Sequence, residues 1–172
     1  MGAFTKAIIR QGFSTVYRPS STILPASRDQ LTKNSPAEIS LSSGTGTNAV
    51  DLEYIAQLTL AASANSDYDL RGVLVDAFGA TTSFAKVKGL YVFAAAANTN
   101  NVIVKPATTN GFLGPFGAAA HQVSIPPGGS LQLTAPGAGW TVTAGTGDLI
   151  NIANSSSGSS VTFDLHIIGT SV

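Results

Sequence analysis

The residues best suited to metal or acid–base chemistry are the two histidines, His121 and His166. Asp164 and His166 lie two positions apart on one expected strand, so their side chains would share a face of a sheet. This pair is the best candidate for such a site. A hydrolytic zinc site, however, takes three protein ligands, with histidine prominent, and any polar strand face produces the same spacing. We therefore expect a solvated pair rather than a functional one.

The other residues that could take part in catalysis lack the neighbouring residues that their chemistry needs. Serines are plentiful, but none lies in the Gly-x-Ser-x-Gly turn of an activated nucleophile, and no lysine-containing glycine-rich phosphate loop occurs. The carboxylate pairs Asp51/Glu53 and Asp67/Asp69 fall on expected polar strand faces, where solvated surface is the simpler interpretation. Calcium would need about six or more oxygen ligands. The sequence predicts a protein that is not an enzyme, with no catalytic residues, metal site or cofactor.

Strands are the elements that must position any site in this chain. Residues 50–60 alternate, with Leu52, Tyr54, Leu58 and Leu60 on one face, and residues 84–93 alternate before becoming continuously apolar. Further short strands are expected at 101–105, 122–125, 130–134, 140–142, 148–153 and 161–168, with a helical turn at 81–83. Gly- and Pro-rich turns separate them, and no long amphipathic helix follows residue 37. An antiparallel β-sandwich or barrel is therefore predicted.

Composition favours an assembled protein over a free enzyme. Charged residues make up 10% of the chain, against a typical value of about 25%, and a neutral surface is easily desolvated by a partner. A neutral surface without a partner is the alternative. Cysteine is absent. No membrane partner is expected, since the apolar stretches are far shorter than the about 18 residues of a membrane span.

The charges divide the chain into two parts of opposite sign. Residues 1–36 carry five basic residues against Asp29 alone, a net charge of +4, and residues 37–172 carry four basic and eight acidic residues, a net charge of −4. Opposite signs favour docking of the first part on its own body or on a neighbour. The basic residues are spread out without a run of five, so no nucleic-acid partner is expected.

The first 36 residues read as an extended arm and residues 37–172 as the sandwich domain. Prolines at 19, 25 and 36 predict irregular chain over 18–36, while residues 13–18 alternate with a two-residue period that predicts a short strand. The arm is too apolar for a solvated tail, and burial on its own domain or on another subunit stays open. The expected interface residues are Phe4, Ile8, Ile9, Arg10, Phe13, Tyr17, Arg18, Ile23 and Leu24.

From about residue 70 onward the chain resembles structural proteins of tailed-phage virions. The resemblance lies in residues 84–92, in Ile125-Pro126-Pro127-Gly128-Gly129-Ser130, in residues 139–142 and in the segments 147–154, 161–164 and 167–170. It implies a jelly-roll-like antiparallel β-sandwich and the role of a head decoration or cement protein. Such a role implies a homotrimer on the outer capsid surface, with the major capsid protein as partner and no active site.

Two functions follow as hypotheses. In the first, the chain is a virion structural protein whose arm staples neighbouring capsomers. In the second, it is a tail-fibre or carbohydrate-binding sandwich module, since jelly rolls also form lectins. For that alternative Phe112, Phe116 and Trp140 are the aromatic residues outside long strands, although Trp140 suits a core anchor or an interface better than a sugar platform.

Overall fold

The structure, a computed structural model, describes residues 6–17, 31–72, 74–76 and 79–172, and for residues 13, 15–17 and 31–36 it describes the backbone alone. The described residues form strands and loops without a helix, so none of them crosses a membrane as a helix. The long strands of the body are β4 (Leu52–Leu60), β5 (Asn65–Asp69), β8 (Lys86–Ala94), β9 (Val102–Pro106), β10 (Val123–Ile125), β11 (Ser130–Thr134), β13 (Leu149–Asn154) and β14 (Val161–Thr170). The shorter strands are β3 (Ala49–Val50), β6 (Leu74–Val75), β7 (Thr81–Thr82) and β12 (Trp140–Thr141).

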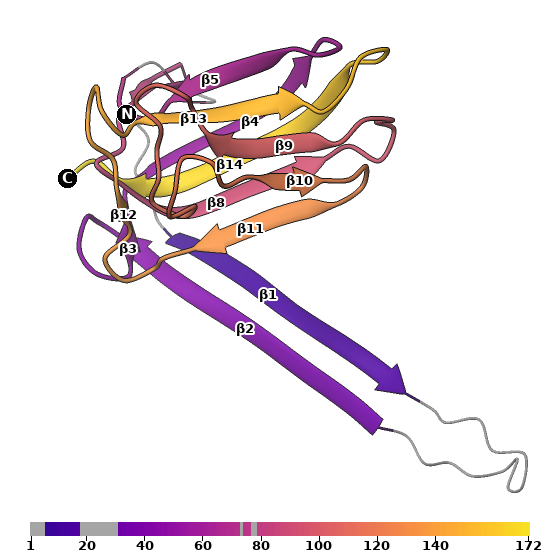
Figure 1. The fold of residues 1–172 in the computed structure, drawn as a ribbon. Coiled ribbons are helices and arrows are strands. Elements are labelled where there is room, and N and C mark those ends of the chain that lie inside the picture. The colour runs from indigo at the N-terminus through magenta and orange to yellow at the C-terminus, as the bar shows by residue number, and fades with distance from the viewer. Residues whose placement is uncertain (1–5, 18–30, 73, 77–78) are drawn as a thin grey trace, which may run out of the picture.

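The eight long strands of the body form two packed antiparallel sheets (Figure 1). Sheet I has the order β11-β8-β14-β4, with β12 continuing beside β8, and sheet II has the order β10-β9-β13-β5. Successive strands cross from one sheet to the other, except for β9 and β10, which are neighbours. This strand order is that of the jelly roll, in which two Greek keys build a double sheet. The predicted all-β, jelly-roll-like fold is confirmed.

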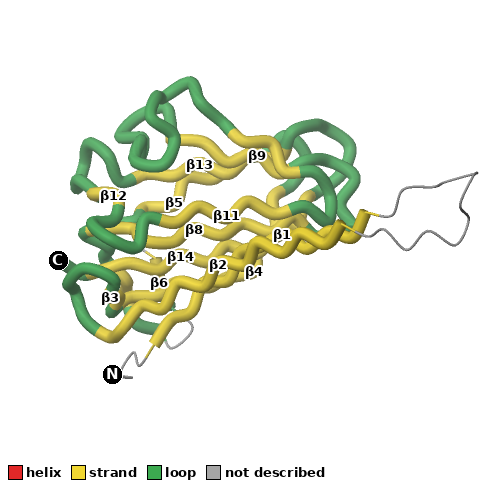
Figure 2. Tube along the Cα trace, turned by 90° about the horizontal axis from the view of Figure 1, so that it is seen from below, coloured by secondary structure: helices red, strands yellow, loops and turns green. Residues whose placement is uncertain are grey.

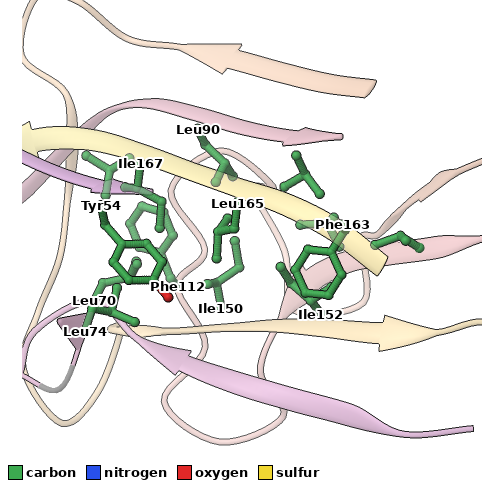
Figure 3. Close-up of a cluster of buried hydrophobic side chains, with 14 of the residues drawn as sticks. Tyr54, Leu70, Leu74, Leu90, Phe112, Ile150, Ile152, Phe163, Leu165 and Ile167 are labelled. Atoms are coloured by element: carbon green, nitrogen blue, oxygen red, sulfur yellow. The ribbon is translucent and has the colours of Figure 1, made fainter. Parts of the chain in front are cut away.

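The core lies between the two sheets and follows the alternation of their strands. In Figure 3, Leu165 and Ile167 of β14 point toward Ile150 and Ile152 of β13, and all four are at most 1% exposed. Tyr68 meets Phe163 edge to face, with ring centroids 6.4 Å apart. The predicted inward face of β4 is confirmed by its packing against this core.

The arm forms a long hairpin instead of an irregular tether. Strand β1 (Lys6–Tyr17) pairs antiparallel with β2 (Leu31–Ser43) along its whole length, and Gly12 lies opposite Pro36. Irregular chain was therefore the wrong prediction for residues 31–36, and the expected domain boundary at residue 36 falls inside β2. A proline is tolerated there because, within the part of the chain that the structure describes, most of β2 has no second neighbour, so its other edge needs no donor.

Only the base of this hairpin lies close to the sandwich. Figure 1 shows β1 leaving the body at a steep angle and β2 returning alongside it to end beside β3. The view from below shows both strands crossing the sandwich diagonally (Figure 2). At about 3.4 Å per residue, a twelve-residue strand such as β1 is about 40 Å long. The hairpin therefore extends well beyond its attachment.

Candidate interface at the hairpin and sheet I

Four apolar side chains fix the hairpin base to the body. In β1 the odd-numbered residues Ala7 and Ile9 face the sandwich, and opposite them in β2 lie Leu41 and Ile39. They pack with Val50 and with Ile168 of β14. Leu41 is completely buried and Ile9 is 8% exposed. This small cluster is separate from the main core, so the hairpin has its own anchor.

Gly89 makes room for that anchor on the outer face of sheet I. It lies beside Ile168 in the ladder between β8 and β14. A Cβ atom at position 89 would lie 2.8 Å from Ile168 Cγ1 and 3.5 Å from Ile9 Cδ1. A glycine within a strand often marks a close approach of this kind. The hairpin can therefore sit close to the sheet only because residue 89 has no side chain.

A buried lysine ties the loop after β2 to the same region. The β8–β14 ladder shifts register at Lys88, so this residue lies in a bulge, and it is only 1% exposed. Its Nζ donates a hydrogen bond of 2.5 Å to the carbonyl oxygen of Gly46. Burial lowers the pKa of Lys88, and Lys86 lowers it further, whereas Asp51 opposes both. The side chain of Lys88 thus connects sheet I to the loop that follows β2.

A cleft of about 450 Å³ opens where the hairpin leaves the sheet. One wall is the strand segment from Lys6 to Arg10, and the other is the outer face of sheet I. Sheet I contributes Glu53, Gly89, Leu90, Tyr91, Gln132, Leu133, Thr134, His166 and Ile168. The walls of the cleft combine polar and apolar residues, with Tyr91 among them, and a continuous strand runs along one side.

Three rows of residues on the outer face of sheet I carry acidic groups and no Lys or Arg, whereas Lys86 lies further along β8, opposite Thr170. In order across β11, β8, β14 and β4, the residues of these rows are Thr134, Gly89, Ile168 and Glu53, then Gln132, Tyr91, His166 and Ile55, then Ser130, Phe93, Asp164 and Gln57. Ile55 is 48% exposed. This face therefore combines carboxylates with partly exposed apolar side chains.

Asp164 and His166 share the outer face, as predicted, but they have separate partners. Asp164 Oδ1 accepts a hydrogen bond from Gln57 at 2.9 Å, and His166 Nε2 lies 2.7 Å from Glu53 Oε1. The other histidine, His121, is exposed and contacts the carbonyl oxygen of Phe116. Among the described residues no three His, Cys, Asp or Glu side chains gather into a metal site.

The carboxylate pair Asp67/Asp69 and the three aromatic residues considered for sugar binding also contact the rest of the body. Asp67 accepts a hydrogen bond from Asn151 at 2.6 Å and Asp69 one from the backbone of Arg71 at 2.7 Å. Phe112 and Phe116 are buried, and Trp140 is half-buried against the core. The two phenylalanines therefore cannot stack on a sugar.

The expected interface residues divide into three groups. Ile9 packs on the chain's own sandwich, while Ile8 is 41% exposed and Arg10 makes an exposed ion pair with Glu38 at 3.0 Å. Phe13 and Tyr17 lie in β1, opposite Ser35 and Leu31. The other four, Phe4, Arg18, Ile23 and Leu24, lie outside the described residues.

Sequence reasoning missed Lys88, Gly89 and the Glu53–His166 contact. A lysine and a glycine inside a strongly apolar strand, residues 86–94, were the available signal, because both are unfavourable in a central strand unless something uses them.

Comparison with known proteins adds little to this geometry. No protein family model and no curated protein matches the chain. Among solved structures it is similar to an unassembled VP1 pentamer of Washington University polyomavirus, with 11% identity, 98% of each chain covered and a TM-score of 0.18. A similarity at that level carries no argument, and the fold rests on the strand order.

Proposed function

We propose that this chain is a non-enzymatic structural protein of a virion, a head decoration or cement protein of a tailed phage. It would lie on the outer capsid surface, bind the major capsid protein and other copies of itself, and staple neighbouring capsomers through its hairpin. A homotrimer is the form that the resemblance implies. The supporting fold-level observation is the jelly roll, which viral capsid subunits use, although lectins use it as well.

The observation that carries this proposal is the projecting hairpin. An isolated two-stranded hairpin is at best marginally stable in water, and a third strand or an apolar partner is needed to hold it. The base has that partner in Val50 and Ile168, against which Ile9 and Leu41 pack. The remainder, residues 11–17 with 31–37, extends away from the body (Figure 1); we call it the overhang. Its ladder would be stabilised by packing on another subunit.

Binding of this kind stabilises a shell by mass action. A protein that binds the assembled shell but not free subunits contributes about 2.7 kcal/mol per site at a concentration one hundred times its Kd. The apolar area that the overhang buries supplies about 25 cal/mol per Å², less the cost of ordering both partners.

A shortened hairpin tests the proposal. Residues 12–36 are replaced by Asn-Gly, a two-residue turn suited to joining paired strands, because Gln11 lies directly opposite Ala37. The base and its apolar cluster remain. We expect this variant to fold like the full chain but to lose co-sedimentation with purified shells of the major capsid protein. Unchanged binding to shells would refute the assigned role of the hairpin.

A further inference from the structure

The hairpin has an unpaired strand edge along β1. In its sheet the order is β1-β2-β3, so β1 is an edge strand with no neighbour on its other side among the described residues. Residues 6–17 contain no proline, whereas β2 contains Pro36. A long proline-free edge is a template for pairing with another strand. The edge of β1 is therefore the one suited to strand addition.

The same edge borders the cleft. Residues 6–10 of β1 form one wall of the cleft, and Tyr91, Gln132 and His166 lie across from them. A strand entering the cleft could pair with the β1 backbone and place alternate side chains over the outer face of sheet I, as in recognition by strand addition. The cleft can therefore hold an extended strand, and the β1 edge that borders it continues into the overhang.

The chain's own overhang cannot fill this cleft. The ladder between β1 and β2 runs in register from Lys6/Ser42 to Tyr17/Leu31 without a bulge. Its apolar cluster fixes it at Ile9 and Leu41, and from there the paired strands leave the sheet in one direction (Figure 1). To return to the cleft the ladder would have to fold back on itself within a few residues.

The overhang and the sheet I wall of the cleft carry charges of opposite sign. The three rows of sheet I described above carry Glu53 and Asp164 and no Lys or Arg, and Glu53 lines the cleft. The β1 wall carries Lys6 and Arg10, of which Arg10 is paired with Glu38. The overhang carries Lys33 and no acidic residue, within an arm whose net charge is +4. Complementary charges steer encounter and fix orientation between partners.

We propose that the overhang of one copy docks into the cleft of a second copy of this chain, adding a strand to the edge of β1. The contact joins two different surfaces, so copies associate head to tail and close into a ring or extend into a chain. The inference builds on the proposed assembly function, since it names what the hairpin grips. Copies seated on neighbouring capsomers would then be linked by their hairpins.

Engineered cysteines test the contact directly, because the chain has no cysteine of its own. One batch carries Thr15→Cys, at a position with the strand parity of Phe13 and Tyr17, and the other carries Gln132→Cys in the cleft. Mixed and mildly oxidised, the two should form a disulfide-linked heterodimer. The matched control replaces Gln132→Cys with Ser124→Cys, an exposed residue on sheet II, and should stay at least tenfold less cross-linked.

Each outcome decides the inference. Cross-linking at Gln132 but not at Ser124, together with a mass that rises with concentration in light scattering, would support it. Equal cross-linking at both sites, or a monomer up to millimolar concentration, would overturn it. So would an intramolecular disulfide in one chain that carries both Thr15→Cys and Gln132→Cys, because the overhang would then reach its own sheet.

A filled cleft provides a second variant. Gln132→Trp places an indole in the cleft from the half-exposed edge strand β11, and it should lower self-association at least tenfold while circular dichroism stays unchanged. The experiments use purified protein without shells, so the two proposals fail separately. A protein that stays monomeric but still binds shells through the hairpin would contradict only the docking into the cleft. A protein that self-associates but does not bind shells would contradict only the capsid role.

Discussion

At the scale of single residues, the attachment of the hairpin to sheet I depends on Gly89, which has no side chain, and on the charged side chain of Lys88. Gly89 leaves the space that Ile9 and Ile168 occupy, and Lys88 supplies the hydrogen bond to Gly46. Both residues lie in β8, an interior strand of sheet I. Neither improves the sandwich itself, since glycine packs nothing and a buried ammonium is costly to desolvate. Their presence is explained by the hairpin that they hold.

Gly89→Ala should loosen the hairpin base. The new methyl would lie 2.8 Å from Ile168 Cγ1, so Ile168 has to move, and overpacking of this kind costs about 1–3 kcal/mol. Urea unfolding measures the loss, and faster amide exchange in residues 6–10 locates it. The matched control is Gly137→Ala, where no atom lies within 4 Å of the added Cβ. A loss of equal size at both positions would contradict this account.

Lys88→Met should change how stability depends on pH. Burial lowers the pKa of Lys88 in the folded chain below its ordinary value of 10.5. Between the lowered pKa and 10.5 the unfolded chain binds more protons, so raising the pH stabilises the folded state. The wild type should therefore gain stability relative to Lys88→Met as the pH rises from 7 toward 10.5.

Urea unfolding of both proteins at several pH values measures that difference. Burial raises the pKa of Tyr54 and Tyr68, and this opposes folding above pH 10 in both chains alike. The tyrosine contribution therefore cancels in the comparison. A difference that stays constant with pH would show that Lys88 keeps its ordinary pKa.

At the scale of elements, the hairpin is attached by a satellite cluster and not by the main core. Leu41→Ala removes a completely buried side chain from it and should cost about 2–4 kcal/mol, with early local opening of β1 and β2. Ile8→Ala lies in the same hairpin but is 41% exposed and should cost under about 1 kcal/mol. Hydrogen exchange followed by mass spectrometry separates the two. Uniform opening of hairpin and sandwich in Leu41→Ala would contradict a separate anchor.

Sequence patterns located the strands that alternate or lie between clear turns, and missed a strand rich in polar residues. Strand β4 followed from its two-residue period, whereas β14 and β11 followed from the turns that bound them, β11 at its observed bounds. Strand β5, Asn65–Asp69, went unpredicted because Asn and Asp are depleted in strands. The helical turn expected at 81–83 is wrong, since Thr81–Thr82 pairs with Leu74–Val75. The prolines led us to predict irregular chain where residues 31–36 of β2 pair with β1.

At the scale of the whole molecule, the strand order and the site depend on contacts that a single sequence does not display. The jelly-roll order pairs β4 with β14, whose residues Leu60 and Val161 are partners far apart in the chain. Turn signals fixed where strands end, but not which strands meet. The cleft is equally non-local, because it combines residues 6–10 with β8, β11 and β14. In the sequence, only the opposite net charges of the arm and the body indicated that the two come into contact.

That sign difference predicts how self-association responds to salt. The arm carries +4 and the remainder −4, and the Debye length shortens from about 10 Å at 0.1 M salt to about 3 Å at 1 M. Raising the salt concentration should therefore weaken association, mainly through slower encounter. Sedimentation velocity between 50 mM and 1 M sodium chloride measures the change. Lys33→Gln in the overhang should flatten this dependence, whereas Lys105→Gln on sheet II should leave it unaltered. Association that strengthens with salt would instead assign the contact to apolar burial alone, and the carboxylates of sheet I would have no part in it.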